Sequence, residues 1–440
     1  MISPQGAAMI AGQTPLLRAA ALSKTYRTPD HIGRLVLEHV DFTLNQGEIV
    51  AVLGKSGSGK STFLRILAGL IPPSGGTVEY RGRSIVEPAR GVAMVFQSFA
   101  LFPWLTVLGN VELGLEAQGV SATDRRRRAV DAIDLIGLDG FENAYPKELS
   151  GGMRQRVGFA RALVVNPDIL LLDEPFSALD VLTAETLRND LLDLWSESRI
   201  PTKGILVVSH NIEEAVEMAD RILIFSSDPG RISAEIKVPM PHPRDWDSPQ
   251  FRQIVDQVYT LLTTGPGHGR RGAKPEPIGL GYRLPDAAVQ QLTGLIDRLT
   301  EPMFNGHADL PHLADEESLA VDELFPLIEA LQILGFANVS GGDIDLTVGG
   351  RAYAEADMQT RKQVFADAVL KHVPLAAHIR RVLDERPGHR APAARFLREL
   401  EDHLSEDEAE RVFETLINWG RHAEIFAYDY DDEVLSLENF

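Results

Sequence analysis

One Gly-rich segment has the residue types and the spacing of a loop that binds phosphate groups. It reads Gly-Lys-Ser-Gly-Ser-Gly-Lys-Ser, and it stands between a predicted buried strand, 49–53, and a predicted helix, 62–70. Glycines let backbone N–H groups turn inward on phosphate oxygens, a lysine adds positive charge, and a serine hydroxyl can bind Mg²⁺. The residues that we expect to bind the phosphates are Gly54, Lys55, Ser56, Gly57, Ser58, Gly59, Lys60, Ser61 and Thr62.

Two adjacent carboxylates follow a second apolar strand. Residues 169–172 are Ile-Leu-Leu-Leu, and Asp173 and Glu174 come next. One carboxylate must stay ionised to hold Mg²⁺, while the other orients or deprotonates a water that attacks a γ-phosphate. We therefore assign the metal to Asp173 with Ser61, and the catalytic role to Glu174. Two solvated acids at a strand end would have the same sequence, but together with the Gly-rich loop the pair predicts a P-loop nucleoside triphosphatase.

A third motif, Leu-Ser-Gly-Gly-Met-Arg-Gln at 149–155, begins a predicted helix at 153–165. Ser150, Gly151 and Gly152 would leave a hydroxyl and backbone donors exposed at the N-terminus of this helix, where a second anion can bind. One chain thus carries two half-sites for a nucleotide: the phosphate loop and this third motif, the signature motif. On this motif the chain resembles the ATPase subunits of ABC transporters, from its start to about residue 240.

The resemblance implies a fold, ligands and further site residues. The fold would be α/β, with a P-loop ABC ATPase domain made of a RecA-like core and a helical subdomain. ATP and Mg²⁺ would bind, and the signature motif of one protomer would close over the nucleotide of the other in a head-to-tail homodimer. By the family's order of motifs, Tyr26 would stack on adenine, and Gln97 would ligate Mg²⁺ and sense the γ-phosphate. Asp180, in the loop that contacts the opposite protomer, would join the nucleotide-binding residues, and His210 would touch the γ-phosphate as a catalytic residue.

An unusually apolar loop, Ser-Phe-Ala-Leu-Phe-Pro-Trp-Leu-Thr-Val, follows Gln97. Exposed apolar loops mark partner surfaces, and a large aromatic such as Trp104 often dominates them. These aromatics could instead pack inside the helical subdomain. The resemblance implies that the region from Gln97 to Val107 contacts a transmembrane permease. Segments 102–107 and 228–232 are similar to nitrate, sulfonate and taurine importers, which implies uptake of a small anion and, indirectly, a periplasmic or lipid-anchored solute-binding protein.

Composition restricts the remaining possibilities. The chain has 440 residues, no cysteine and a formal net charge of −20. The absence of cysteine excludes disulfides and thiol chemistry. The negative charge opposes a sequence-independent grip on nucleic acid, so no nucleic-acid partner is expected. No stretch reaches the roughly 20 apolar residues of a membrane helix. The resemblance then implies a peripheral protein on the cytoplasmic face of the inner membrane.

We expect two domains joined by a linker. The ABC ATPase domain would span 15–262, a Gly/Pro-rich linker 263–285, and a C-terminal α+β domain 286–440. In the last domain, helical spacing at 324–334, a hairpin at 339–346 and a helix at 347–369 predict a winged helix. A second copy would follow, with a capping box at Ser405 and Glu408, a helix to residue 420 and a hairpin at 425–437.

The C-terminal half resembles the AAA-associated C-terminal domain of some importers in this group. A winged helix suggests DNA, but from Arg270 onward there are 17 Lys and Arg against 32 Asp and Glu, the wrong sign for phosphate contact. We therefore expect a regulatory or protein-interaction domain. The alternative is a soluble ABC ATPase that acts on nucleic acid or the ribosome through its winged helices. Such proteins usually carry two cassettes, whereas this chain has one phosphate loop and one signature motif.

Overall fold

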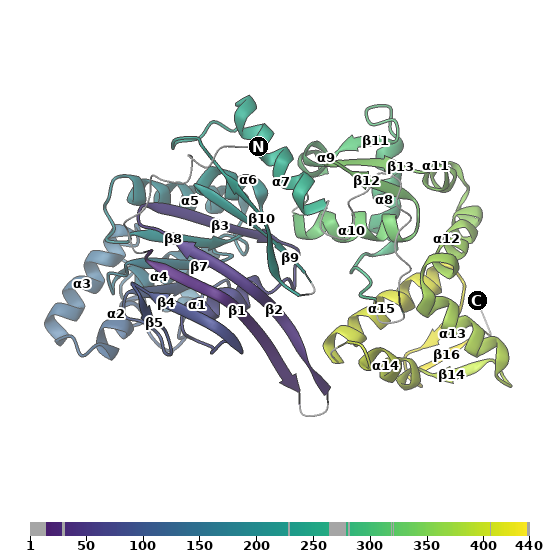
Figure 1. Cartoon of the computed structure of the whole chain (residues 1–440), viewed down its shortest axis with the longest axis horizontal. Coiled ribbons are helices and arrows are strands. Elements are labelled where there is room, and N and C mark those ends of the chain that lie inside the picture. The colour runs from purple at the N-terminus through teal and green to yellow at the C-terminus, as the bar shows by residue number, and fades with distance from the viewer. Residues whose placement is uncertain are drawn as a thin grey trace, which may run out of the picture. The chain divides into compact units, whose positions relative to one another are not determined.

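The fold has two units. The computed structural model describes residues 15–28, 31–227, 229–263, 279, 282–317, 319, 321–404 and 406–437. Its contacts divide the chain into Met1–Val258 and Tyr259–Phe440 (Figure 1). The predicted first domain extends slightly beyond this division, because helix α7 (Pro249–Thr263) runs through it. Asp228 and most of the predicted linker, 264–278 with 280 and 281, lie outside the described residues.

The first unit is built on a six-stranded sheet in the order β10-β9-β3-β8-β7-β6. Strands β6, β7, β8, β3 and β9 run parallel, and β10 pairs antiparallel with β9. The central strands are buried along their length, which explains their runs of Val, Ile and Leu. The bounds are β3 Glu48–Gly54, β6 Val92–Val95, β7 Ile169–Asp173, β8 Gly204–Val208, β9 Arg221–Ser226 and β10 Arg231–Lys237.

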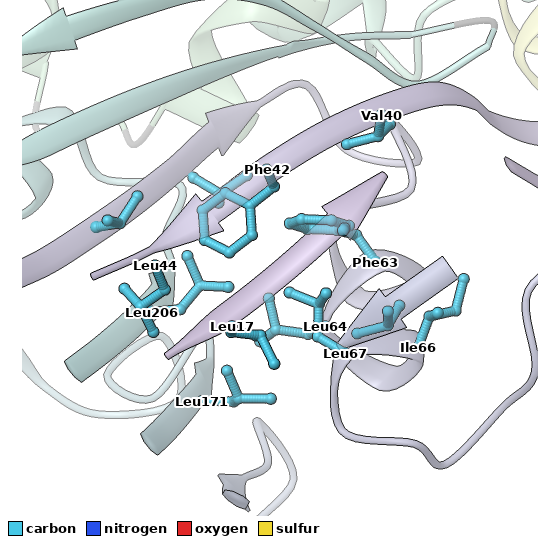
Figure 2. Close-up of a cluster of buried hydrophobic side chains, with 14 of the residues drawn as sticks. Leu17, Val40, Phe42, Leu44, Phe63, Leu64, Ile66, Leu67, Leu171 and Leu206 are labelled. Atoms are coloured by element: carbon cyan, nitrogen blue, oxygen red, sulfur yellow. The ribbon is translucent and has the colours of Figure 1, made fainter. Parts of the chain in front are cut away.

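A four-stranded antiparallel sheet, β2-β1-β4-β5, shares an apolar core with the first sheet and with helix α1. Figure 2 shows part of this core, in which Phe42 of β2 meets Phe63 of α1 edge to face, with ring centroids 5.5 Å apart. The core fixes where α1 begins relative to β3. The bounds are β1 Leu17–Thr28, β2 His31–Leu44, β4 Gly75–Tyr80, β5 Arg83–Ser84 and α1 Lys60–Leu67.

Helices α2 (Val107–Ala117), α3 (Ala122–Leu135) and α4 (Gly151–Leu163) pack on one another and form the predicted helical subdomain. Helix α4 begins at residue 151 rather than at the predicted 153, because Ser150 caps it: the Ser150 hydroxyl accepts a hydrogen bond from the Met153 N–H at 3.2 Å. The remaining elements of this unit are η1 Pro146–Glu148, α5 Val181–Ser196 and α6 Ile212–Met218.

The second unit repeats one order of elements: a helix, a strand, two helices and a hairpin. In each copy the first strand pairs with the last, which gives the sheets β11-β13-β12 and β14-β16-β15. This order supports the tandem winged helices, which stay a prediction. The first copy holds α8 Val289–Thr300, β11 His307–Asp309, α9 Leu310–Glu317, α10 Val321–Ile333, β12 Ala337–Ser340 and β13 Asp343–Leu346. The second holds α13 Pro374–Glu385, β14 Arg390–Pro392, α14 Ala393–Glu401, α15 Glu406–His422, β15 Ala427–Asp429 and β16 Val434–Ser436.

The predicted single helix at 347–369 is wrong. Two helices lie there, α11 (Val348–Glu355) and α12 (Met358–His372). The backbone of Ala356 is extended, with ψ 152°, and the Asp357 carboxylate accepts a hydrogen bond from the Thr360 N–H at 2.8 Å, which begins the next helix. The predicted hairpin at 339–346 is confirmed by the pairing of β12 with β13. Ser405, the first residue of the predicted capping box, lies outside the described residues.

None of the helices in the described part of the chain is long and apolar enough to cross a membrane.

Candidate active site

Four neighbouring strands of the six-stranded sheet end at one edge. Strands β3, β8, β7 and β6 lie side by side and parallel, so their carboxyl ends meet there. The segments that leave these ends carry, in that order, the phosphate loop, His210, Asp173 with Glu174, and Gln97. Residues far apart in the sequence are thus brought together by strand order.

The phosphate loop turns tightly between β3 and α1. Gly59 has φ 92°, and a Cβ atom there would lie 2.8 Å from a Leu37 methyl, so this position requires glycine. Inside the loop, the Lys60 ammonium donates to the main-chain oxygens of Gly54 at 2.6 Å and Lys55 at 3.1 Å. Gly59 is the N-cap residue of α1, so no side chain accepts a hydrogen bond from the first N–H groups of the helix. The other predicted residues of the loop and the first turn of α1 are Ser56, Gly57, Ser58, Ser61 and Thr62.

A hydroxyl and a buried carboxylate meet beside this loop. The Ser61 hydroxyl donates to Asp173 Oδ1 at 2.8 Å, and Asp173 is buried. Burial raises the pKa of Asp173, because the charged form loses solvation. Hard oxygen donors of this kind are the ligands that Mg²⁺ takes, and a cation there would favour the ionised carboxylate. Ser61 and Asp173 therefore fit the metal.

Glu174 is held by two polar neighbours. Its backbone adopts the left-handed region, with φ 47°, an uncommon conformation for a non-glycine residue that often marks functional sites. The Gln97 amide donates to Glu174 Oε2 at 2.8 Å, and His210 Nδ1 lies 3.5 Å from the same oxygen. Interaction with His210 lowers the pKa of Glu174, so this carboxylate stays ionised near neutral pH. Gln97, also predicted to ligate the metal, here contacts the carboxylate predicted to be catalytic.

The signature motif is fixed to the loop around Asp180. A Cβ atom on Gly152 would lie 2.3 Å from the Thr183 methyl, so only glycine lets α4 and α5 approach this closely. Asp180 caps α5: its carboxylate accepts a hydrogen bond from the Thr183 N–H at 3.1 Å. Ser150 caps α4, and its backbone is extended. The N-termini of both helices are thus set relative to each other, with Gly151 as the first residue of α4.

Tyr26 lies on β1, in the four-stranded antiparallel sheet, whereas the catalytic groups follow strands of the six-stranded sheet. It pairs with Arg34 of β2, and Val36, two residues further along β2, lies close to Gly59 of the phosphate loop. The ring is 43% exposed, and the Lys24 ammonium lies 5.0 Å from its centroid. An exposed aromatic face close to the phosphate loop can stack on a nucleotide base.

The apolar loop after Gln97 is supported by a buried amide that the sequence analysis missed. Asn110 is fully buried; its Oδ1 accepts from the Phe102 N–H at 2.8 Å, and its Nδ2 donates to the oxygens of Phe102, Leu105 and Thr106. The loop presents Trp104, which is 70% exposed and tilted against Phe102 at 5.3 Å. Trp104 does not pack inside the helical subdomain. The signal that could have revealed Asn110 is a polar residue on the apolar face of its helix.

Comparisons with known proteins identify the family to which the chain belongs. Residues 37–177 match the family described as ABC transporter, and residues 311–429 match the C-terminal AAA-associated domain. The nitrate import ATP-binding protein NrtD of Synechocystis sp. is 41% identical over 237 residues, 52% of this chain and 88% of that protein. The taurine import ATP-binding protein TauB of Rhizobium johnstonii is 41% identical over 52% of this chain and 90% of that protein. The aliphatic sulfonates import ATP-binding protein SsuB of Bacillus cereus is 41% identical over 52% and 89%.

The match to the ABC transporter family covers the phosphate loop, the paired carboxylates and the signature motif. The relatives are matched over most of their own length, at an identity that leaves the family in no doubt. The chain is an ATPase of the ABC transporter ATP-binding family, and it carries a C-terminal AAA-associated domain.

Proposed function

We propose that the edge formed by β3, β8, β7 and β6 binds ATP and hydrolyses its γ-phosphate bond. The observation that carries the proposal is the placement of Glu174, ionised and held between Gln97 and His210, next to the Ser61 and Asp173 pair. A carboxylate in this position can orient or deprotonate a water molecule, which contributes roughly 10²- to 10⁴-fold to a rate.

Each residue has a defined role in this proposal. The loop amides and Lys60 bind the β- and γ-phosphates, and His210 contacts the γ-phosphate. Ser61 and Asp173, with Gln97, would hold Mg²⁺, which neutralises phosphate charge when bound. Tyr26 stacks on adenine.

The two half-sites support a head-to-tail homodimer. Ser150, Gly151 and Gly152 stand at a helix N-terminus that can accept an anion, and Asp180 stands at the N-terminus of the helix packed on it. In the dimer these residues complete the nucleotide site of the opposite protomer. ATP binding therefore closes the dimer and hydrolysis lets it open.

The names of the relatives support an importer that takes up a small anion of the nitrate, taurine or sulfonate type. The exposed Trp104 lies on a loop that is held by hydrogen bonds to Asn110. This loop would dock on a transmembrane permease at the cytoplasmic face of the membrane. A periplasmic or lipid-anchored solute-binding protein would deliver the solute. The acidic second unit would regulate the ATPase or bind a protein partner, because its charge opposes contact with nucleic acid.

The substitution Glu174→Gln tests the hydrolysis step. We expect ATPase activity to fall by roughly 10²-fold or more, because the amide cannot accept a proton, while ATP binding is retained and the ATP-bound dimer accumulates. The measurements are phosphate release and light scattering with ATP and Mg²⁺. Glu185→Gln, an exposed position on α5, is the control. Unchanged phosphate release in Glu174→Gln would refute the assignment.

Purification of the detergent-solubilised complex from its native membrane tests the transport assignment. We expect a multi-span permease to co-purify in near-equal amount. The transported solute can then be identified by measuring the uptake of candidate anions into vesicles that contain the complex. Ribosomal proteins or nucleic acid without a permease would overturn the importer proposal.

A further inference from the structure

The turn between β9 and β10 lies against the phosphate loop. Gly230 ends this turn, and it forms a parallel bridge with β2. Its N–H donates to the Val36 oxygen at 2.9 Å, and its oxygen accepts from the Glu38 N–H at 3.0 Å. Val36 in turn lies close to Gly59 of the loop. The turn is therefore joined to the same strand that passes beside the phosphate loop.

There is no room for a side chain at Gly230. A Cβ atom there would lie 2.2 Å from the main-chain oxygen of Ser58 and 3.0 Å from a Leu37 methyl. The Ser58 oxygen belongs to the backbone of the phosphate loop, so it can move only if the loop changes shape. Leu37 is fully buried in the core. Only glycine therefore lets the turn lie this close to the loop.

Ser58 is also enclosed by the end of β3. Its hydroxyl oxygen lies 3.1 Å from the position that a Cβ atom on Gly54 would take, and its N–H donates to the Lys55 oxygen at 3.2 Å. The residue is only 1% exposed. An atom added at residue 230 would therefore push on the loop, because a close-packed interior has no free space to absorb it.

The flanks of the turn hold it in place. Arg231, the first residue of β10, forms an ion pair with Glu38 of β2. Phe225 of β9 is buried in the core, where its ring centroid lies 5.3 Å from that of Phe63 in α1. The turn therefore cannot move away from the loop without disturbing this core, so the loop has to give way when the contact tightens.

We propose that Gly230 is a positioning residue for the phosphate loop: it sets the backbone at Ser58, and with it the N–H groups that bind the β- and γ-phosphates. The proposal rests on the ATP site proposed above. Glu174, Gln97 and His210 follow β7, β6 and β8, whereas Gly230 contacts the loop that follows β3. A displaced loop should therefore weaken nucleotide binding more than it slows the hydrolysis of bound ATP.

The substitution Gly230→Ala in the full-length protein tests this role. We expect the Kd for ATP and for ADP to rise by about 10-fold, and the KM for ATP to rise with it, because the added methyl displaces the loop. At saturating ATP, kcat should stay within about 2-fold of the wild type, since the hydrolytic groups keep their places. Calorimetric titration with each nucleotide and phosphate release are the measurements.

Gly204→Ala is the matched control. Gly204 begins β8, at the edge of the sheet opposite to the site, and a Cβ atom there would lie 3.2 Å from the Asn45 main-chain oxygen. This variant should lower the thermal stability of the same unit without changing the Kd. Wild-type affinity in Gly230→Ala would overturn the inference, as would a fall in kcat at an unchanged KM. A wild-type protein that binds no ATP would instead overturn the proposed function.

If Gly230→Ala does not fold, amide hydrogen exchange in the wild type decides. Coupling between two sites is reciprocal, so a turn that supports the nucleotide-binding shape of the loop must be stabilised when ADP binds. We expect exchange of the Glu38 N–H, which donates to Gly230, to slow by about 10-fold with ADP. The Gly47 N–H, which donates to the Lys203 oxygen at 2.7 Å, is the control amide. Equal exchange at Glu38 with and without ADP would refute the coupling.

Discussion

At the scale of single residues, Gly152 is a point of close packing between helices α4 and α5. The Thr183 methyl lies 2.3 Å from the position that a Cβ atom on residue 152 would take. This contact connects the signature motif to the helix capped by Asp180, so we expect a change at Gly152 to shift the N-terminus of α5 as well.

We expect Gly152→Ala to destabilise the first unit by about 1–3 kcal/mol, because the added methyl overpacks the contact between α4 and α5. ATPase activity should fall as the N-terminus of α4 shifts. Denaturant titration followed by a probe in this unit measures the loss. Thr183→Ser removes the opposing methyl, so the double variant should recover part of the stability. A double variant no more stable than Gly152→Ala would show that Thr183 is not the cause.

The buried Glu214 predicts a pH dependence of stability. Its folded pKa of about 7 lies above the ordinary value of 4.5, so its contribution to stability is fully present below pH 4.5 and is lost as the pH rises through 7. The variant Glu214→Gln carries no such penalty. We expect it to match the wild type at pH 4.5 and to exceed it at pH 8, by up to about 3 kcal/mol. Thermal unfolding of both proteins at the two pH values is the measurement, and a difference that does not grow with pH would contradict it.

At the scale of elements, a single buried amide on α2 determines the shape of the loop that presents Trp104. Asn110 bonds to both the N–H and the oxygen of Phe102, and also to two further carbonyls of the loop. A loop held by hydrogen bonds to a buried side chain is ordered without needing strand partners.

We expect Asn110→Ala to destabilise the helical subdomain by about 1–3 kcal/mol, because several buried backbone groups lose their partner. Amide hydrogen exchange at Phe102 should accelerate, since its N–H loses its acceptor. Trp104→Ala is the informative comparison: it should leave this exchange unchanged but reduce permease-stimulated ATPase activity. Slow exchange at Phe102 in Asn110→Ala would disprove the role of the amide.

At the scale of the whole molecule, the chain joins an ATPase unit to an acidic second unit with its own core and two small sheets. The second unit matches the AAA-associated domain, and the 17 basic against 32 acidic residues from Arg270 onward argue against a surface that binds phosphate groups.

We expect removal of residues 272–440 to leave ATP binding by the first unit intact. The rate of ATP hydrolysis or of transport should change by at least about 2-fold, which corresponds to about 0.4 kcal/mol in the activation barrier. The comparison is made in the reconstituted complex with its permease. Equal ATPase and transport rates in both forms would remove the regulatory role. DNA added to the full-length protein should not alter either rate.

The sequence by itself determined the chemistry and the strands that carry it. The phosphate loop, the paired carboxylates and the signature motif are local patterns, since each depends on residues adjacent in the chain, and the strands before them are recognisable as short apolar runs. The first hairpin of the second unit was predictable for the same reason. The break at Ala356 was missed, because Ala352, Ala354 and Ala356 all favour a helix.

Only the tertiary structure decided which of these groups meet. The approach of Gln97 and His210 to Glu174 depends on strand order, which brings together residues 36 to 113 positions apart along the chain. The glycine requirement at Gly152, the support of the Trp104 loop by Asn110 and the raised pKa of Glu214 are equally invisible in the sequence. Each of them depends on packing against, or burial by, atoms from a distant segment, and no local pattern of residue types encodes that proximity.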